Sequence, residues 1–411
     1  MPLAIVLSRA QTGMESREVA VEVDLAPGLP SLSIVGLAET AVKESKDRVR
    51  SAIHNAGFEF PTRRITVNLA PADLPKEGGR FDLPIAIGIL AASGQLPVDV
   101  LSRVEFLGEL ALGGDLRGVS GVLPSVVAAA QKSRAIIVPE DDGHQAALAP
   151  SARVYPASHL LEVTAHLAGT EPLPRLVTEL PDVPHEGPDL ADVRGQHLAK
   201  RALGDRRRRR TSPADGGASG HRQDHAGAAP AGTAAAARRG SGPETASVWS
   251  LAGSGFDVAR WRQRPFRSPH HGISAAALVG GGSPPKPGEI SLAHNGVLFL
   301  DELPEFGPRV LDQLREPLET GEVHISRVAH QRRYPARFQL VAAMNLCRCG
   351  RLGDPRGECR CSPEQVRKYQ ERISGPLLDR IDIQVHVKPV PHASLTAAGE
   401  LARRVHRYDS G

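Results

Sequence analysis

Residues 296–306 read Gly-Val-Leu-Phe-Leu-Asp-Glu-Leu-Pro-Glu-Phe, an apolar run that ends at two carboxylates, Asp301 and Glu302. Continuous apolar runs are typical of parallel strands that are buried on both faces. In open α/β sheets, chemistry collects beyond the carboxyl ends of such strands. The stretch therefore predicts a parallel α/β sheet with Asp301 and Glu302 at its functional edge. The alternative is an ordinary strand that ends in a solvated Asp-Glu pair.

A second strand of the same kind is predicted further along the chain. Residues 338–345 read Phe-Gln-Leu-Val-Ala-Ala-Met-Asn, so one polar residue, Asn345, stands at the end of an apolar run. Between the two strands we expect a helix over residues 310–318 and a β-hairpin over residues 322–333. The hairpin carries three arginines, Arg327, Arg332 and Arg333.

The N-terminal part of the chain predicts a separate α+β domain over residues 1–168. Val19, Val21, Val23 and Leu25 alternate with polar or small residues, which is the period of a half-buried strand. Further strands are predicted over residues 32–35, 65–69, 104–107 and 135–138, and helices over residues 37–54 and 83–92. Residues 169–190 are rich in proline and are expected to form a linker. A second domain over residues 191–390 and a short tail over residues 391–411 complete the predicted organisation.

Bulk composition narrows the class of protein. The chain has 411 residues and a formal net charge of +4, but the run Arg206 to Arg210 contributes much of that excess, so charge is weak evidence for nucleic-acid binding. All four cysteines lie between Cys347 and Cys361, which does not suit a disulfide-stapled secreted domain. The apolar run at residues 3–7 is too short for a signal peptide or a membrane span. We therefore expect a cytoplasmic protein without a membrane partner.

The four cysteines form a pattern of their own. Cys347 and Cys349 make one C-x-C pair, and Cys359 and Cys361 make another nine residues later. Four thiolates can close a tetrahedral zinc site, and the glycines of the intervening stretch let the chain turn back. Free thiols or redox-sensitive disulfides are the alternatives.

Residues 204–243 carry no motif that could bind phosphate. A P-loop needs glycines whose amides surround phosphate, a lysine and a hydroxyl, but this stretch holds a run of five arginines and an Ala/Gly/Arg-rich tract. A disordered basic linker that binds nucleic acid is one interpretation. Another is a disrupted reading frame: permitted codons for residues 217–226, read one nucleotide later, spell Gly-Pro-Pro-Gly-Thr-Gly-Lys-Thr-Met. That is a complete Walker A motif, and the same shift starting at Gly204 joins smoothly to residues 201–203.

Together, residues 1–203 and 244–390 resemble the ComM/YifB family of Mg-chelatase-like AAA+ ATPases. The resemblance rests on residues 192–203, on Arg-Pro-Phe-Arg-Ser-Pro-His-His at 264–271, on the two strands above and on Ser-Gly-Pro-Leu-Leu-Asp-Arg-Ile-Asp-Ile at 374–383. It implies an α/β P-loop AAA+ core with a parallel sheet. It also implies an α+β N-terminal domain of the ribosomal S5 domain 2-like, Lon-type fold, matched most closely at residues 74–82. Arg80 and Leu123 stand where Lon-type peptidases have their serine and lysine, so no peptidase activity is expected.

The resemblance also assigns roles to single residues. Asp301 would hold the Mg²⁺ of Mg-ATP, Glu302 would activate the attacking water, and Asn345 would contact the water or the γ-phosphate. Arg380, with Arg372 in reserve, would be the arginine supplied to a neighbouring subunit. The basic hairpin would face a central pore. The paired histidines at 270–271 are not expected to bind metal, because adjacent side chains on an extended chain point in opposite directions.

The activity implied by the family is that of an ATP hydrolase driving a hexameric motor on single-stranded or branched DNA during competence and recombination, with ATP and Mg²⁺ as cofactors. A Mg-chelatase motor subunit and an inactive, frame-disrupted remnant that binds no ATP are the rivals. The family's helical lid, with its second sensor arginine, is expected to be missing after residue 390.

The interpretation of residues 204–243 as a disrupted reading frame makes a prediction about the coding DNA. One insertion or deletion should lie near codon 204 and a compensating one near codon 243, because the sequence resembles the family again at residues 244–252. Sequencing of the gene checks this. Codons at 217–224 that cannot spell the P-loop in the next frame would overturn it.

Overall fold

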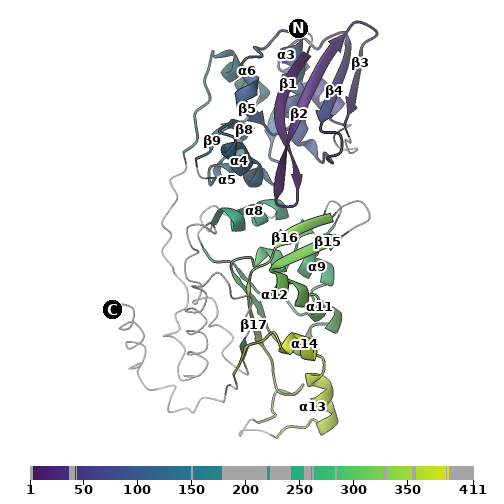
Figure 1. Ribbon diagram of the computed structural model, residues 1–411, viewed down its shortest axis with the longest axis vertical. Coiled ribbons are helices and arrows are strands. Elements are labelled where there is room, and N and C mark those ends of the chain that lie inside the picture. Colours follow the sequence, from purple (N-terminus) through teal and green to yellow (C-terminus); the bar gives the residue numbers. More distant parts are fainter. Residues whose placement is uncertain are drawn as a thin grey trace, which may run out of the picture. The chain divides into compact units, whose positions relative to one another are not determined.

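The computed structural model describes residues 3–36, 42, 44–149, 151–177, 220–222, 242–253, 261, 263–282, 285–326, 331–353, 358–385 and 387 (Figure 1). The chain divides into two compact units, Met1–Pro181 with Trp249–Trp261, and Asp182–Val248 with Arg262–Gly411. Each unit has its own large sheet. The proposed entry helix at 192–203 and the tail at 391–411 lie outside the described residues.

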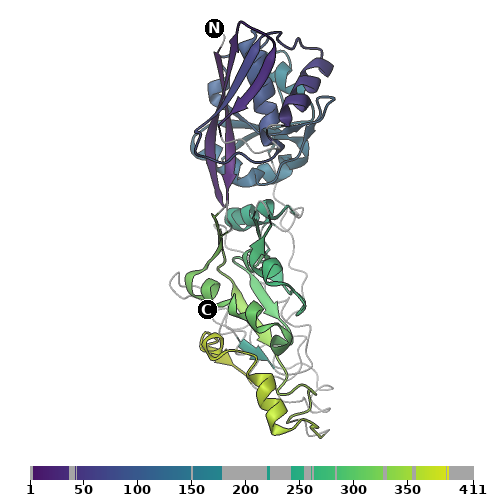
Figure 2. The same ribbon diagram turned by 90° about the vertical axis from the view of Figure 1, so that its right-hand side faces the viewer.

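The first unit is built on a mixed seven-stranded sheet in the order β3-β4-β2-β1-β5-β8-β9. The strands are β1 (Leu3–Thr12), β2 (Glu15–Ala26), β3 (Ser31–Val35), β4 (Arg64–Ala70), β5 (Val104–Phe106), β8 (Ala135–Pro139) and β9 (Arg153–Ala157). The β1–β2 and β2–β4 pairs are antiparallel and the other pairs are parallel. β1 and β2 are the two long purple strands in Figure 2. The alternation predicted along β2 is confirmed, because its four apolar residues from Val19 to Leu25 are all buried.

The helices of this unit are α2 (Ser45–Asn55), α3 (Asp82–Ala92), α4 (Val122–Gln131), α5 (Glu140–Ala146) and α6 (Leu160–Ala168), with short helices η1 (Gly79–Phe81) and η2 (Leu101–Arg103) and a small β6 (Glu109–Leu110), β7 (Leu116–Arg117) ladder. Every residue of α3 is buried. A Cβ at Gly88 would lie 2.5 Å from Cγ2 of Val23, so the missing side chain lets α3 approach β2 closely. The helix predicted over residues 83–92 is confirmed.

The second unit contains a five-stranded sheet in the order β11-β14-β17-β10-β18, and every described pair in it is parallel. The strands are β11 (Phe266–Arg267), β14 (Val297–Leu300), β17 (Gln339–Ala343), β10 (Gly220–Arg222) and β18 (Ile383–Gln384). All of β14 is buried. The parallel α/β sheet predicted from the apolar runs is therefore confirmed. β10 lies inside residues 204–243, where the sequence shows no strand period.

Helix α8 (Gly242–Ala252) is divided between the two units. The shorter elements of the second unit are α9 (Ala275–Val279), β12 (Gly280–Gly281), β13 (Lys286–Pro287), α10 (Glu289–Leu292), η6 (Leu303–Glu305), α11 (Pro308–Asp312), α12 (Arg315–Thr320), β15 (Glu322–Ser326), β16 (Gln331–Pro335), α13 (Pro363–Gln370) and α14 (Gly375–Leu378). A single helix was predicted over residues 310–318, but the structure has two short helices there, α11 and α12. No helix among the described residues is long and apolar enough to cross a membrane.

The predicted hairpin is present as the antiparallel pair β15 and β16. Its arginines differ in their surroundings. Arg333 is exposed and lies 3.4 Å from Glu322, whereas Arg332 is buried, so only part of the hairpin's positive charge faces solvent. Arg327 lies outside the described residues.

Two ion pairs with buried carboxylates lie within the first unit. Arg9 donates two hydrogen bonds to Glu105, at 2.6 and 2.8 Å, and Arg48 donates two to Asp82, at 2.7 and 3.1 Å. Arg80 is buried in η1 and donates to the carbonyl of Ser120. Charged side chains are costly to bury unless they form hydrogen bonds or ion pairs. We therefore assign these buried charges a role in stabilising the fold.

Asp82 provides a test of that interior. Burial raises its pKa to about 6 against the opposing effect of Arg48. A carboxyl whose pKa is higher in the folded state binds its proton more tightly there, so its contribution to stability is lost as pH rises from about 4 to about 6. A shift of about two units amounts to at most about 3 kcal/mol. We expect Asp82→Asn to gain stability relative to the parent between pH 4 and 7, measured by hydrogen exchange of the α3 amides.

Asp47→Asn, which removes an exposed carboxyl of α2, is the matched control. Parallel stability curves for the parent and Asp82→Asn across this pH range would contradict the prediction.

Candidate functional site

The ends of β14 and β17 bring three polar residues to one edge of the second sheet. The strands pair in parallel with Leu298 opposite Leu340 and Leu300 opposite Ala342. Asp301 and Glu302 follow β14 directly, and Asn345 follows β17 after one intervening residue. The two carboxylates are exposed and Asn345 is half-buried. The structure therefore places the predicted site residues of both strands at the same edge.

A turn after β14 presents the carboxylates to solvent. Glu302 adopts φ 53° and ψ 47°, the left-handed region, and its N–H donates to Oδ1 of Asp301 at 2.9 Å. A non-glycine residue in this conformation costs on the order of 1 kcal/mol, which the surrounding structure has to offset. The turn leads into η6, whose Leu303 and Pro304 are buried and fix its position.

His271 is a neighbour of Glu302 that the sequence did not indicate. Its Nδ1 lies 3.3 Å from Oε2 of Glu302. The expectation that the paired histidines point apart is wrong, because the rings of His270 and His271 lie with centroids 4.0 Å apart. The family-like motif at residues 264–271 marked His271 as a residue of interest. Its contact with Glu302 depends on tertiary structure, so the sequence alone could not predict it. His271 is placed to orient the Glu302 carboxylate.

Arg372, two residues beyond the end of helix α13, contacts the segment after the carboxylates. Arg372 donates to the carbonyl of Pro304 at 3.2 Å and to Oε2 of Glu305 at 3.1 Å. Burial raises the pKa of Tyr369 to about 12, with the carboxylates of Glu305 and Glu302 acting in the same direction. Arg372, the reserve candidate for a trans-acting arginine, is thus engaged within its own chain.

Arg380, the first choice for that role, also has partners in its own chain. It forms an ion pair with Glu319 of α12, and its Nη1 lies 3.5 Å from the carbonyl of Pro376. The ion pair is partly exposed on both sides, so a competing anion could take Glu319's place. A role toward a second subunit stays a prediction.

The order of the strands indicates where a phosphate-binding loop would start. From β11 to β14 to β17 the chain moves across the sheet in one direction, but β10, which precedes them all, lies on the far side of β17 beside β18. Ligands of open α/β sheets bind at the carboxyl ends of strands near such a reversal. The Walker A motif of the shifted frame would occupy residues 217–225, which include the three residues of β10. Residues 204–243 contain no lysine.

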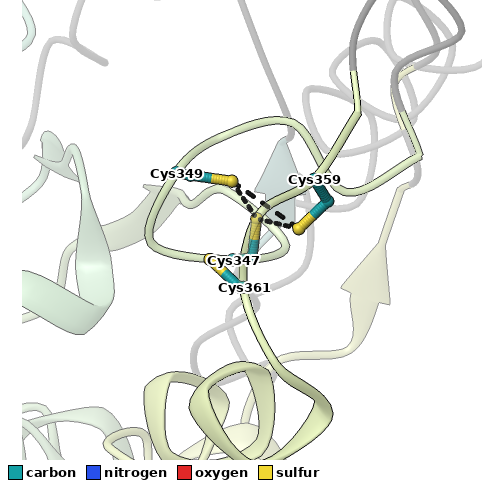
Figure 3. A group of neighbouring side chains, drawn as sticks. All are labelled: Cys347, Cys349, Cys359 and Cys361. Atoms are coloured by element: carbon teal, nitrogen blue, oxygen red, sulfur yellow. Dashed lines mark hydrogen bonds between the residues drawn. The ribbon is translucent and has the colours of Figure 1, made fainter.

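The four cysteines converge just beyond Asn345 (Figure 3). Sγ of Cys347 lies 3.4 Å from that of Cys349 and 3.6 Å from that of Cys359, and Cys349 and Cys359 are 3.6 Å apart. All four sulfurs lie within 4.8 Å of one another, and the thiols are free. Backbone N–H groups of Arg351 and Arg360 lower the pKa of Cys349 to about 6. This cluster could hold a metal ion.

A parallel sheet with paired carboxylates beyond one strand and an amide beyond the next defines the class of α/β proteins built on an AAA+ core. The family described as magnesium chelatase, subunit ChlI, matches residues 230–395, and the related ChlI family matches residues 21–142. The chain is 50% identical to competence protein ComM of Haemophilus influenzae, over 97% of this chain and 79% of that protein. It is 47% identical to YifB of Escherichia coli, over 95% and 77% respectively. The chain belongs to the ComM/YifB family of magnesium-chelatase-like AAA+ proteins.

The chain also has a more distant likeness. Lon protease 2 of Bacillus subtilis is 26% identical over 140 residues, which is 30% of this chain and 25% of that protein. The positions assigned to the peptidase dyad hold Arg80 and Leu123, both buried. Neither side chain supplies a nucleophile or its base.

The contact between Arg372 and the Pro304–Glu305 segment can be tested. Arg372→Ala should speed exchange of the Glu305 and Phe306 amides by roughly tenfold, because a hydrogen bond from a charged group stabilises the segment. Arg367→Ala, which removes an exposed pair with Glu371 from the same helix, is the control. Equal exchange in both variants would show that Arg372 does not hold this segment.

Proposed function

We propose that the chain is built as an ATP-driven motor of the AAA+ type that acts on single-stranded or branched DNA. The observation that carries the proposal is the placement of Asp301, Glu302 and Asn345 at one edge of a parallel sheet whose sequence matches the magnesium chelatase family. ATP and Mg²⁺ would be the cofactors, with a structural Zn²⁺ at the cysteines. Cytoplasmic location and a hexameric ring are part of the proposal.

Each site residue has a separate task in this proposal. Asp301 would hold the Mg²⁺ of the nucleotide, directly or through water. Glu302 would orient the attacking water and accept its proton, with His271 restraining the carboxylate. Asn345 would hydrogen-bond the water or the γ-phosphate. Arg380 would leave Glu319 and stabilise the developing charge in a neighbouring subunit, a contribution of about 10³ to 10⁵ in rate in enzymes that use such an arginine.

The phosphate-binding side of the site does not fit this chemistry in the present sequence. Residues 204–243 supply no lysine to reach the β- and γ-phosphates, although β10 occupies the sheet position from which a P-loop would extend. Positioning supplies most of the catalysis of phosphoryl transfer. We therefore propose that the chain as it stands neither binds nor hydrolyses ATP appreciably, as a frame-disrupted member of its family.

Action on DNA is proposed from the relative's name and from the surface. The relative from Haemophilus influenzae is named a competence protein. On this chain, Arg333 is exposed on the β15–β16 hairpin, where a strand of nucleic acid could contact it. The first unit, proposed to have the ribosomal S5 domain 2-like fold, would serve as a scaffold without peptidase activity.

A Mg-chelatase motor subunit is the second candidate, favoured by the family description that matches residues 230–395. A chelatase-subunit family also matches residues 21–142 of the first unit, whereas the relatives named ComM and YifB match nearly the whole chain. Stimulation of ATP hydrolysis by DNA would favour the first candidate over the second.

The test uses two proteins, the present chain and a repaired chain in which the frame of residues 204–243 is restored. We expect ATP hydrolysis, stimulated by single-stranded DNA, only in the repaired chain. Glu302→Gln in that chain should lower turnover by about 10² to 10⁴ and leave ATP binding largely intact, since an amide cannot accept the proton.

Glu364→Gln, at an exposed glutamate on α13, is the matched control and should hydrolyse ATP normally. Vigorous hydrolysis by the unrepaired chain would refute the proposed loss of the P-loop. Equal turnover of the repaired chain with and without Glu302 would refute its role as base.

A further inference from the structure

We infer that the four cysteines form a Zn²⁺ centre that positions the site, by holding Asn345 and the segment after Glu302 in place. The inference deepens the proposed function and rests on the roles proposed there for Asn345 and Glu302. Its test uses no nucleotide, so it can fail while the proposed ATPase function stands.

The arrangement of the sulfurs fits tetrahedral zinc. Four Zn–S bonds of about 2.3 Å at tetrahedral angles place neighbouring sulfurs about 3.8 Å apart. Three of the sulfur pairs are at 3.4 to 3.6 Å, and the widest is within 4.8 Å, so small shifts would give a regular site. Disulfide sulfurs are about 2.05 Å apart, well below these separations. On binding, the thiols would release their protons to solvent and ligate as thiolates.

The first half of the cluster lies against Asn345. Cys347 is fully buried, and its carbonyl accepts a hydrogen bond from the N–H of Gly350 at 3.0 Å. Gly350 has φ 73°, and a Cβ there would lie 3.8 Å from Nδ2 of Asn345. The turn from Cys347 to Gly350 therefore passes close to the Asn345 side chain. Fixing this turn through Cys347 and Cys349 would restrict where the amide can point.

The second half of the cluster leads into α13. Ser362, next to Cys361, caps α13 with a capping box in which its side chain accepts from the N–H of Gln365. At the far end of the helix, the side chain of Gln370 donates to the carbonyl of Leu346 at 3.0 Å. The chain from Cys347 to Gln370 thus returns to the residue that follows Asn345. Zinc would close the end of this loop where the cysteines meet.

Helix α13 also connects the cysteine cluster to the segment that follows Asp301 and Glu302. Arg372 follows α13 and binds the carbonyl of Pro304 and the carboxylate of Glu305, which lie in η6 directly after Glu302. A metal centre at one end of α13 would therefore limit motion at the ends of both β14 and β17. The cysteines are accordingly assigned a positioning role, because they are not placed to touch substrate.

The experiment uses the full chain and Zn²⁺ alone. Bound zinc is measured by elemental analysis, and tetrathiolate coordination by the visible absorption of the Co²⁺-substituted protein. Hydrogen exchange of the amides at 303, 305, 306 and 340–346 is compared before and after chelation. We expect one zinc per chain, and roughly tenfold faster exchange at these amides after zinc removal, with β1 and β2 unchanged.

Variants at Cys349 sharpen the test, since this residue is exposed and its replacement removes little packing. Cys349→Ser should weaken zinc binding by on the order of a hundredfold and reproduce the faster exchange. Cys349→His should retain both zinc and protection, because Cys₃His is a common zinc set. Arg360→Ala, an exposed residue between Cys359 and Cys361, is the matched control and should behave as the parent.

A protein that binds no zinc, or whose Co²⁺ form lacks tetrahedral absorption, would overturn the inference. Stoichiometric zinc whose removal leaves exchange at 303, 305, 306 and 340–346 unchanged would also overturn it, because the metal would then stabilise only the loop that binds it.

Discussion

The pairing of β14 with β17 is the constraint on which the rest of the second unit depends. Gly296 precedes β14 where a Cβ would collide with the carbonyl of Pro265, and its own carbonyl accepts from the N–H of Gln339 at 2.9 Å. The strand therefore starts from a fixed point, and its buried side chains hold the register to its end. Because both strands run the same way, fixing their starts also fixes where Asp301 and Asn345 emerge. A slip of one residue would turn every side chain of β14 to the opposite face.

The elements with a clear period could be predicted from the sequence. Alternation along β2 predicts a strand with one buried face, and the short apolar runs of β14 and β17 predict strands that are buried on both faces. The carboxylates and Asn345 could be located because each ends such a run. The convergence of the cysteines followed from their spacing.

Contacts that depend on folding could not be predicted in this way. The approach of His271 to Glu302 and of Arg372 to Pro304 joins residues far apart in the chain, and no local period encodes such pairs. Arg332 is buried although the basic hairpin was expected to face a central pore. The strand period places alternate residues on one face without indicating which face is covered. The break between α11 and α12 likewise leaves no mark in the apolar pattern.

The short strand β10 gives the second unit a further property. Its three residues pair through the backbone with Val341 to Ala343 of β17, and the first two of them also pair with Ile383 and Gln384 of β18. Main-chain hydrogen bonds depend little on which side chains a strand carries. Almost any extended segment without proline can therefore occupy the position between β17 and β18. A segment whose sequence shows no strand period can thus hold an interior place in a parallel sheet through its main chain alone.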